Sequence, residues 1–119
     1  MSKHPLVHVE FSSSDTEASG KFFSDVFGWN VVQMPELNYA TFEAGEGIGG
    51  GFNPVTDEYP AGTVIVYINT DDIEATLVKI EKHGGKTIAP KMEVPEMGWM
   101  ALFTDPTGNM IGLWTEMPR

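Results

Sequence analysis

Strand-like and helix-like stretches of apolar residues alternate along the chain. Residues 6–11 (LVHVEF) are rich in β-branched and aromatic residues, which is typical of a strand. The next stretch, residues 16–27, follows the N-cap candidates of SSSD and places Ala18, Phe22, Phe23 and Val26 on one helical face. Gly28 stands where a C-terminal glycine ends a helix. The chain is therefore predicted to open with a strand followed by a helix.

The rest of the pattern adds strands and repeats the opening. We expect strands near 30–33 and 38–43, then glycine-rich chain that reaches Phe52. A linker with two prolines and a glycine lies at about 54–62. Beyond it, residues 63–69 predict a strand, 72–83 a helix closed by two glycines, and Lys86 the start of a strand. The segment MEVPEMG then leads into a hairpin of 99–104 and 110–115.

The two halves of the chain are an internal repeat. DTEAS (15–19) matches DIEAT (72–76), and at the same offset Gly28 matches Gly85. With a small insertion, IGGGF (48–52) matches MIGLW (110–114). Neither βαβββ half could bury a sheet face alone. We therefore predict one α+β domain over 1–119. Its two tandem modules, about 5–53 and 63–117, form one curved mixed sheet, a half-barrel cleft, with helices outside.

Composition narrows the classes of partner. Seventeen acidic against seven basic residues give a formal charge of −10, which argues against nucleic acid and anionic membrane surfaces. The absence of cysteine excludes disulfides, thiolate metal sites and cysteine nucleophiles. We find neither the apolar core of a signal peptide at the N-terminus nor an apolar run long enough to span a membrane. The expected location is the cytoplasm.

Few residues are candidates for catalysis or for binding a ligand. His8 and Glu10 share one face of the first strand, where two ionisable groups are costly to bury unless they are paired or solvated. GEGIGG (45–50) fits a dinucleotide-binding string, but no helix follows it, so we interpret it as closely approached backbone. DPTGN (105–109) has the residues of a tight turn, and Asp15 and Asp72 are N-cap candidates.

Motifs over nearly the whole chain resemble the vicinal oxygen chelate superfamily. This family includes glyoxalase I, bleomycin-resistance and fosfomycin-resistance proteins and extradiol dioxygenases. The matching segments are HVEFSSSD (8–15), FFSDVFGW (22–29), YINTDDIEAT (67–76), HGGK (83–86) and PEMGWMALFTDPTGNMIGLW (95–114). The chain is most similar to small bacterial glyoxalase-related single-domain proteins. The resemblance also implies a homodimer.

The resemblance implies a divalent metal held by two side chains from each module. Those positions fall on His8, Gly50, Ile65 and Gly112, so three of the four lack a donor atom. One imidazole cannot hold a divalent ion against water. Glu10, Glu43 or Glu116 could substitute, but none occupies a family position. No cofactor is predicted, and metal-dependent catalysis is the least favoured function.

Strand alternation predicts which residues line the cleft with His8. Without a metal, the cleft is aromatic and has few polar groups, as small-molecule sites do. We therefore expect a binding protein for an apolar or aromatic ligand, with a degenerate metal site. The alternative is a lyase or isomerase with His8 as acid or base and Glu10 or Tyr67 as its partner. The expected ligand contacts are His8, Ile48, Gly50, Phe52, Ile65, Tyr67, Met110, Gly112 and Trp114. Trp99 is also expected, at the mouth of the cleft, because the resemblance implies that the segment MEVPEMG folds over it.

Overall fold

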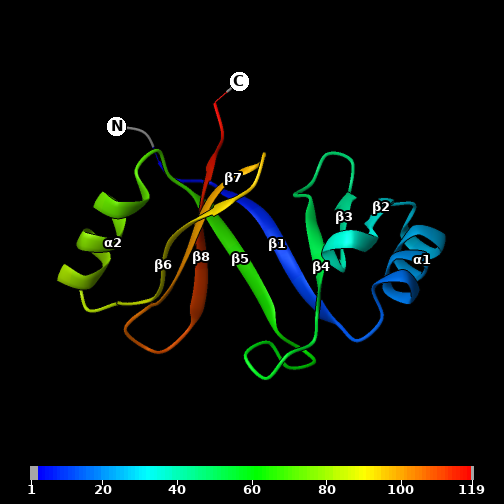
Figure 1. The fold of residues 1–119 in the computed structure, drawn as a ribbon, viewed down its shortest axis with the longest axis horizontal. Helices are drawn as coiled ribbons and strands as arrows, with labels where there is room; N and C mark the ends of the chain where they lie inside the picture. The colour runs from blue at the N-terminus through cyan, green and yellow to red at the C-terminus, as the bar shows by residue number, and fades with distance from the viewer. Residues whose placement is uncertain (1–2, 119) are drawn as a thin grey trace. The chain divides into compact units, whose positions relative to one another are not determined.

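The computed structural model describes residues 3–118 of the chain, which divide into two compact units. The N-terminal unit comprises residues 7–65. The C-terminal unit comprises residues 66–118 together with the segment up to Leu6. Each unit contributes four strands of one eight-stranded sheet and one α-helix (Figure 1).

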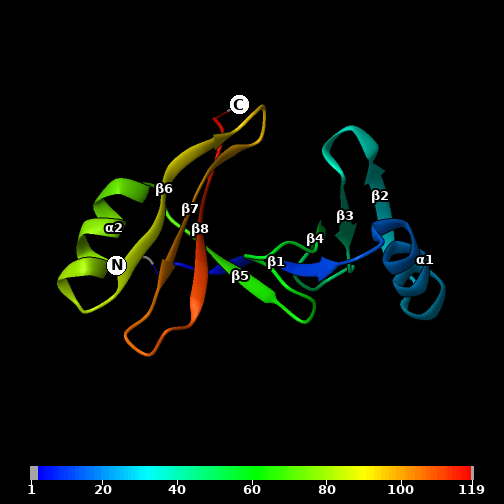
Figure 2. The same ribbon diagram turned by 60° about the horizontal axis from the view of Figure 1, so that its bottom comes forward.

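In the N-terminal unit, four strands follow the order β2-β3-β4-β1. β1 pairs with β4 in parallel, whereas β2–β3 and β3–β4 are antiparallel. Helix α1 lies against β2, β3 and β4 (Figure 2). The elements are β1 (Leu6–Ser13), α1 (Thr16–Phe27), β2 (Asn30–Met34), the 3-10 helix η1 (Pro35–Leu37), β3 (Tyr39–Glu43) and β4 (Gly50–Pro54).

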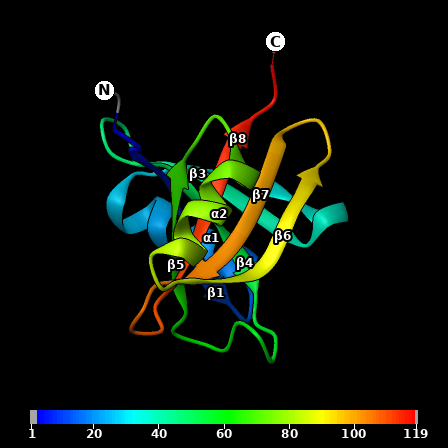
Figure 3. The same cartoon turned by 90° about the vertical axis from the view of Figure 1, so that its left-hand side faces the viewer.

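The C-terminal unit repeats this arrangement with the strand order β5-β8-β7-β6. β5 and β8 are parallel, and β8–β7 and β7–β6 are antiparallel. Figure 3 shows α2 beside the long β6–β7 hairpin. The elements are β5 (Val64–Asn69), α2 (Ile73–Lys82), β6 (Lys86–Val94), β7 (Gly98–Thr104) and β8 (Met110–Glu116).

The repeat is visible in the hydrogen bonds that begin each helix. The Asp15 carboxylate accepts from the amide of Ala18 at 3.0 Å, and Asp72 accepts from Ala75 at the same distance. Because each cap satisfies an amide that the helix leaves without a partner, both aspartates stabilise their helix start. Paired hydroxyls also match at this offset, with Ser13–Ser19 at 2.6 Å and Thr70–Thr76 at 2.8 Å.

Each unit buries an apolar core between its helix and its sheet. In the N-terminal unit this core is aromatic, and Trp29 stacks on Phe42 and Phe23 with ring centroids 4.4 and 4.9 Å apart. The buried members are Ala40, Phe42 and Phe52, with Phe11 and Val31 packed against them. The C-terminal core consists of Ile73, Leu77, Ala101, Phe103 and Leu113.

These observations confirm the α+β class and the βαβββ order of both modules. Gly28 adopts the left-handed conformation expected of a helix C-cap, with φ 75°. Neither α1 nor α2, the two α-helices of residues 3–118, is long and apolar enough to cross a membrane.

The predicted DPTGN turn forms between β7 and β8. Asp105 Oδ1 accepts from the amides of Thr107 (2.9 Å) and Asn109 (3.0 Å), and Oδ2 accepts from the Asn109 side chain (2.8 Å). Gly108 has the positive φ, 92°, that this turn requires. Hydrogen bonds from Asn109 and Thr107 lower the pKa of Asp105 to about 2.

Asp105 should therefore contribute stability that depends on pH. A carboxyl with a folded-state pKa of about 2 stabilises the fold above its ordinary pKa of 3.8 and loses that contribution as the pH falls toward 2. The destabilisation by Asp105→Asn should thus shrink between about pH 4 and pH 2. Denaturant unfolding of both proteins across this range tests it, with an NMR titration of the carboxyl. An Asp105 pKa near 4 would contradict the turn geometry.

Candidate functional site

Four polar side chains meet on one face of the N-terminal unit. The Tyr39 hydroxyl donates to Glu10 Oε2 at 3.0 Å, and the Asn53 amide donates to Glu10 Oε1. The His8 Nε2 atom lies 3.2 Å from both Glu10 Oε2 and the Tyr39 hydroxyl. We call His8, Glu10, Tyr39 and Asn53 the His8–Glu10 cluster.

Strand alternation and register place the cluster. On β1, Val9 and Phe11 pack on the α1 side, so His8 and Glu10 point to the opposite face. On β3, Ala40 and Phe42 are buried on the α1 side, which leaves Tyr39 on the face of His8. Because Ser12 pairs with Asn53 across the parallel β1–β4 ladder, Asn53 shares that face as well.

Gly51 is required by the position of Tyr39. A Cβ atom at Gly51 would overlap the hydroxyl end of the Tyr39 ring, because the phenol crosses the backbone of β4 on its way to Glu10. Glycine in a strand interior commonly marks such a close approach. The hydrogen bonds from Tyr39 to the cluster therefore depend on the absence of a side chain at residue 51.

The cluster holds His8 against a carboxylate. The side chain of Glu10 is 14% exposed and that of His8 30%. The Tyr39 hydroxyl donates to Glu10 Oε2, and His8 Nε2 lies within hydrogen-bond distance of the same oxygen. Glu10 thus orients a histidine, the arrangement that acid–base sites use.

Tyr59 lies in the segment that follows β4, where its amide donates to Thr56 Oγ1 at 3.0 Å and its carbonyl accepts from the Thr56 amide at 3.1 Å. Burial raises the pKa of the Tyr59 phenol, and the charges of Glu58 and Glu10 raise it further.

Two residues of the N-terminal unit that were predicted to share the face of His8 lie on the other face. Gly50 and Phe52 pair with Val9 and Phe11, so they face α1 rather than His8, and Phe52 is fully buried there. The repeat had been aligned by matching Gly50 to Gly112, but the ladders match Gly51 to Gly112. A slip of one residue moves a side chain to the other face of a strand.

Four predicted residues of the C-terminal unit share one face. Tyr67 pairs with Gly112 in the parallel β5–β8 ladder, and its ring occupies the space of a Cβ atom at Gly112. Met110 and Trp114 lie on this face too, because Ile111 and Leu113 pack on the α2 side. Tyr67 is 5% exposed, so its ring is largely covered.

The prediction for Trp99 is wrong. The segment MEVPEMG forms the end of β6 and a tight turn, with Val94 opposite Gly98, rather than a loop over the sheet. Trp99 therefore lies on β7 and packs against the α2-side core, where Lys91 sits 5.3 Å from its ring centroid. Of the remaining predicted contacts, Ile65 is buried on β5 and Ile48 lies half-exposed in the loop before β4.

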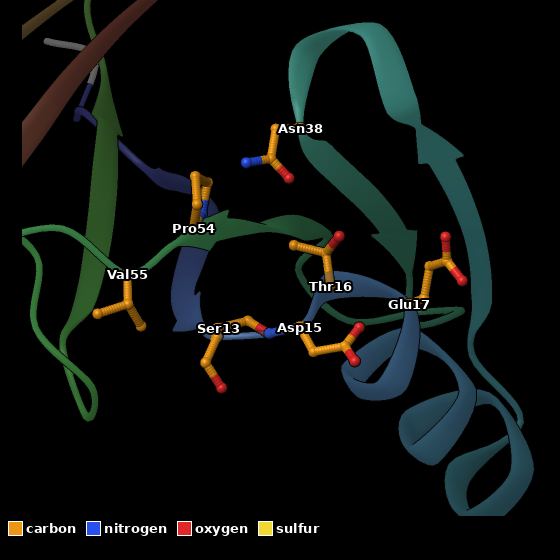
Figure 4. A pocket seen from close by; sticks show the side chains of 8 residues that line it. Ser13, Asp15, Thr16, Glu17, Asn38, Pro54 and Val55 are labelled. Carbon is orange, nitrogen blue, oxygen red and sulfur yellow. The ribbon is translucent and has the colours of Figure 1, made fainter.

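A hollow of about 420 Å³ lies at the start of α1 (Figure 4). Its lining residues are Ser13, Ser14, Asp15, Thr16, Glu17, Asn38, Pro54 and Val55. Its polar groups already serve the helix start, since Asp15 caps α1 and Ser13 bonds Ser19. We therefore assign the site to the His8–Glu10 cluster and no ligand to this hollow.

Comparison with known families decides the membership of the chain. Residues 6–113 match the Glyoxalase/Bleomycin resistance protein/Dioxygenase superfamily. The chain belongs to this superfamily. The predicted resemblance is thereby confirmed, since this is the glyoxalase and extradiol dioxygenase family that the motifs indicated.

Individual members of the glyoxalase superfamily have low sequence identity to this chain. The glyoxylase-named protein CFP32 of Mycobacterium tuberculosis is 30% identical over 89% of this chain and 43% of its own length. The anthracycline biosynthesis protein DnrV of Streptomyces peucetius is 30% identical over 90% of this chain and 45% of its own length. The chain thus spans less than half the length of either relative. Methylmalonyl-CoA epimerase from Mycobacterium tuberculosis has the same fold, with a TM-score of 0.75, 14% identity, and coverage of 95% of this chain and 88% of the epimerase.

The residues present do not fit the divalent metal of the glyoxalase superfamily. Residues 3–118 contain no group of three or more His, Asp or Glu side chains able to hold an ion, the substitute candidates Glu10, Glu43 and Glu116 included. In the N-terminal unit, His8 and Glu10 supply two donors, and the family position beside them is Gly51, covered by Tyr39. Zinc takes four ligands, and calcium and magnesium take six or more.

Sequence reasoning missed Tyr39 and Asn53. The alternation in Tyr39–Phe42 (YATF), with Ala40 and Phe42 apolar, was a usable signal that Tyr39 faces away from the core. Asn53 carried no such signal, because its face depends on the one-residue register of β4.

Gly51→Ala should destabilise the fold by about 1–3 kcal/mol, because the new methyl group displaces Tyr39 from Glu10. Gly47→Ala is the matched control, since no atom lies within 4 Å of a Cβ there. In a Tyr39→Ala background the cost of Gly51→Ala should fall below about 0.5 kcal/mol. Denaturant unfolding of the four proteins measures this, and equal costs in both backgrounds would contradict the assigned contact.

Proposed function

We propose that this glyoxalase-superfamily chain binds a small organic molecule at the His8–Glu10 cluster, without a divalent metal. The observation that carries the proposal is the cluster itself. Its carboxylate accepts from Asn53, Tyr39 and His8, and these bonds hold four polar groups on one face of the N-terminal unit. Convergent polar groups that fix the orientation of a ligand are a usual feature of a small-molecule site.

The surroundings support an apolar or aromatic ligand. Tyr39 places a phenol beside Glu10 in the N-terminal unit. Aromatic side chains commonly line small-molecule sites. The homodimer implied by the resemblance remains a prediction.

A second candidate is an acid–base enzyme of the lyase or isomerase type. The contact that favours it is Glu10 with His8 Nε2, because a carboxylate that orients a histidine is a common arrangement in acid–base sites. Tyr39, rather than the predicted Tyr67, contacts His8 in this cluster. Turnover that is lost in His8→Gln while ligand binding persists would favour this candidate over a binding protein.

The proposal predicts ligand-induced stabilisation that does not need a metal. Screening aromatic small molecules by thermal unfolding should identify ligands whose stabilisation persists in excess EDTA. For such a ligand, His8→Ala should weaken binding about tenfold or more, because a buried hydrogen-bonding partner is lost. The matched control is His83→Ala at the end of α2, outside the cluster, which should leave the affinity unchanged. Stabilisation that EDTA abolishes would contradict the proposal.

A further inference from the structure

The negative charge of the chain is concentrated in the unit that carries the cluster. Residues 7–65 contain nine Asp or Glu and one Lys, so this unit holds a formal charge of −8 out of −10. The remaining residues carry eight acidic and six basic side chains. This asymmetry was not apparent from the composition of the whole chain.

The one lysine of the N-terminal unit lies away from the cluster. Lys21 is on α1, 78% of its side chain is exposed, and its Nζ bonds Asp25 at 2.7 Å. Helix α1 covers the face of the sheet that carries Phe11 and Phe52, opposite to His8. His8 is the other side chain of residues 7–65 that can become cationic.

Acidic groups, in contrast, occur on the side of the cluster. Glu10 is inside it with a side chain 14% exposed, and strand alternation puts Glu43 on the face of Tyr39. The charges of Glu58 and Glu10 both act on Tyr59. Partly buried charges are screened less by salt than exposed ones, so the potential at this face is negative.

We propose that the His8–Glu10 site selects an organic amine cation over a carboxylate of the same shape. This inference rests on the proposed function, because it names the ligand class of the same site. An ammonium group gains from the carboxylate of Glu10 and from the acidic excess of residues 7–65, whereas a carboxylate ligand is repelled by both.

Three indole compounds of matched size test the selection. Tryptamine is a cation, tryptophol is neutral and indoleacetate is an anion at neutral pH. Isothermal titration of the whole chain should give a Kd for tryptamine at least about tenfold below that for indoleacetate, with tryptophol between them. The ratio should narrow between ionic strengths of about 0.01 M and 1 M, because the Debye length falls from about 30 Å to about 3 Å.

Variants that each remove one carboxylate charge test whether the preference for the amine arises at the site. Glu10→Gln should reduce the ratio of the two Kd values about threefold or more, and Glu58→Gln should reduce it in the same direction. Glu46→Gln removes the same charge from an exposed turn of the same unit and should change the ratio less than about twofold. Glu58→Gln also decides the question if Glu10→Gln fails to fold, since Glu58 lies outside the cluster.

The outcomes separate this inference from the proposed function. Equal binding of the three compounds, or tighter binding of indoleacetate, would overturn the charge selection and leave a metal-independent binding site. Absence of binding by all three would overturn both. A preference for tryptamine that persists unchanged in Glu10→Gln and Glu58→Gln would also overturn it, because the amine would then be recognised elsewhere.

Discussion

The candidate site depends on one contact, in which the Tyr39 ring crosses the backbone of Gly51. This crossing brings the phenol hydroxyl to Glu10 and His8, and it is possible because residue 51 has no side chain. The C-terminal unit has two contacts of the same kind, in which the Tyr67 ring lies over Gly112 and the Trp114 ring lies over Gly98. Glycine weakens a strand by about 0.5–1 kcal/mol relative to alanine. The ring that covers the glycine adds apolar contact, and the Tyr39 ring also brings polar contacts with Glu10 and His8.

This contact has a counterpart in the other unit. Gly51 and Gly112 occupy equivalent places opposite Glu10 and Tyr67 in the two parallel ladders. Tyrosine rings occupy the space that a side chain would need at each glycine. The hydrogen bonds around His8 are centred on Glu10, and they can orient a small molecule. The same side chains fit a divalent ion poorly, because they supply too few ligands.

Local signals in the sequence predicted the fold well, and the site only in part. Asp15 and Asp72 act as caps, and the DPTGN turn forms, because each depends on neighbours within a few residues. His8 and Glu10 were predictable as a pair because they alternate on one strand. Gly50 and Phe52 were assigned to the wrong face because that depends on strand register, which no local pattern sets. Trp99 was misplaced because the segment before it extends β6 and turns tightly into β7.

The central claim is the proposal that the His8–Glu10 cluster binds its ligand without a metal, because tyrosine rings fill the space beside Gly51 and Gly112. The most direct measurement is the divalent metal content of the protein, purified without chelator and analysed by mass spectrometry. The account predicts far less than one ion per chain for every divalent metal. A content close to one ion per chain that is lost in His8→Ala would contradict it.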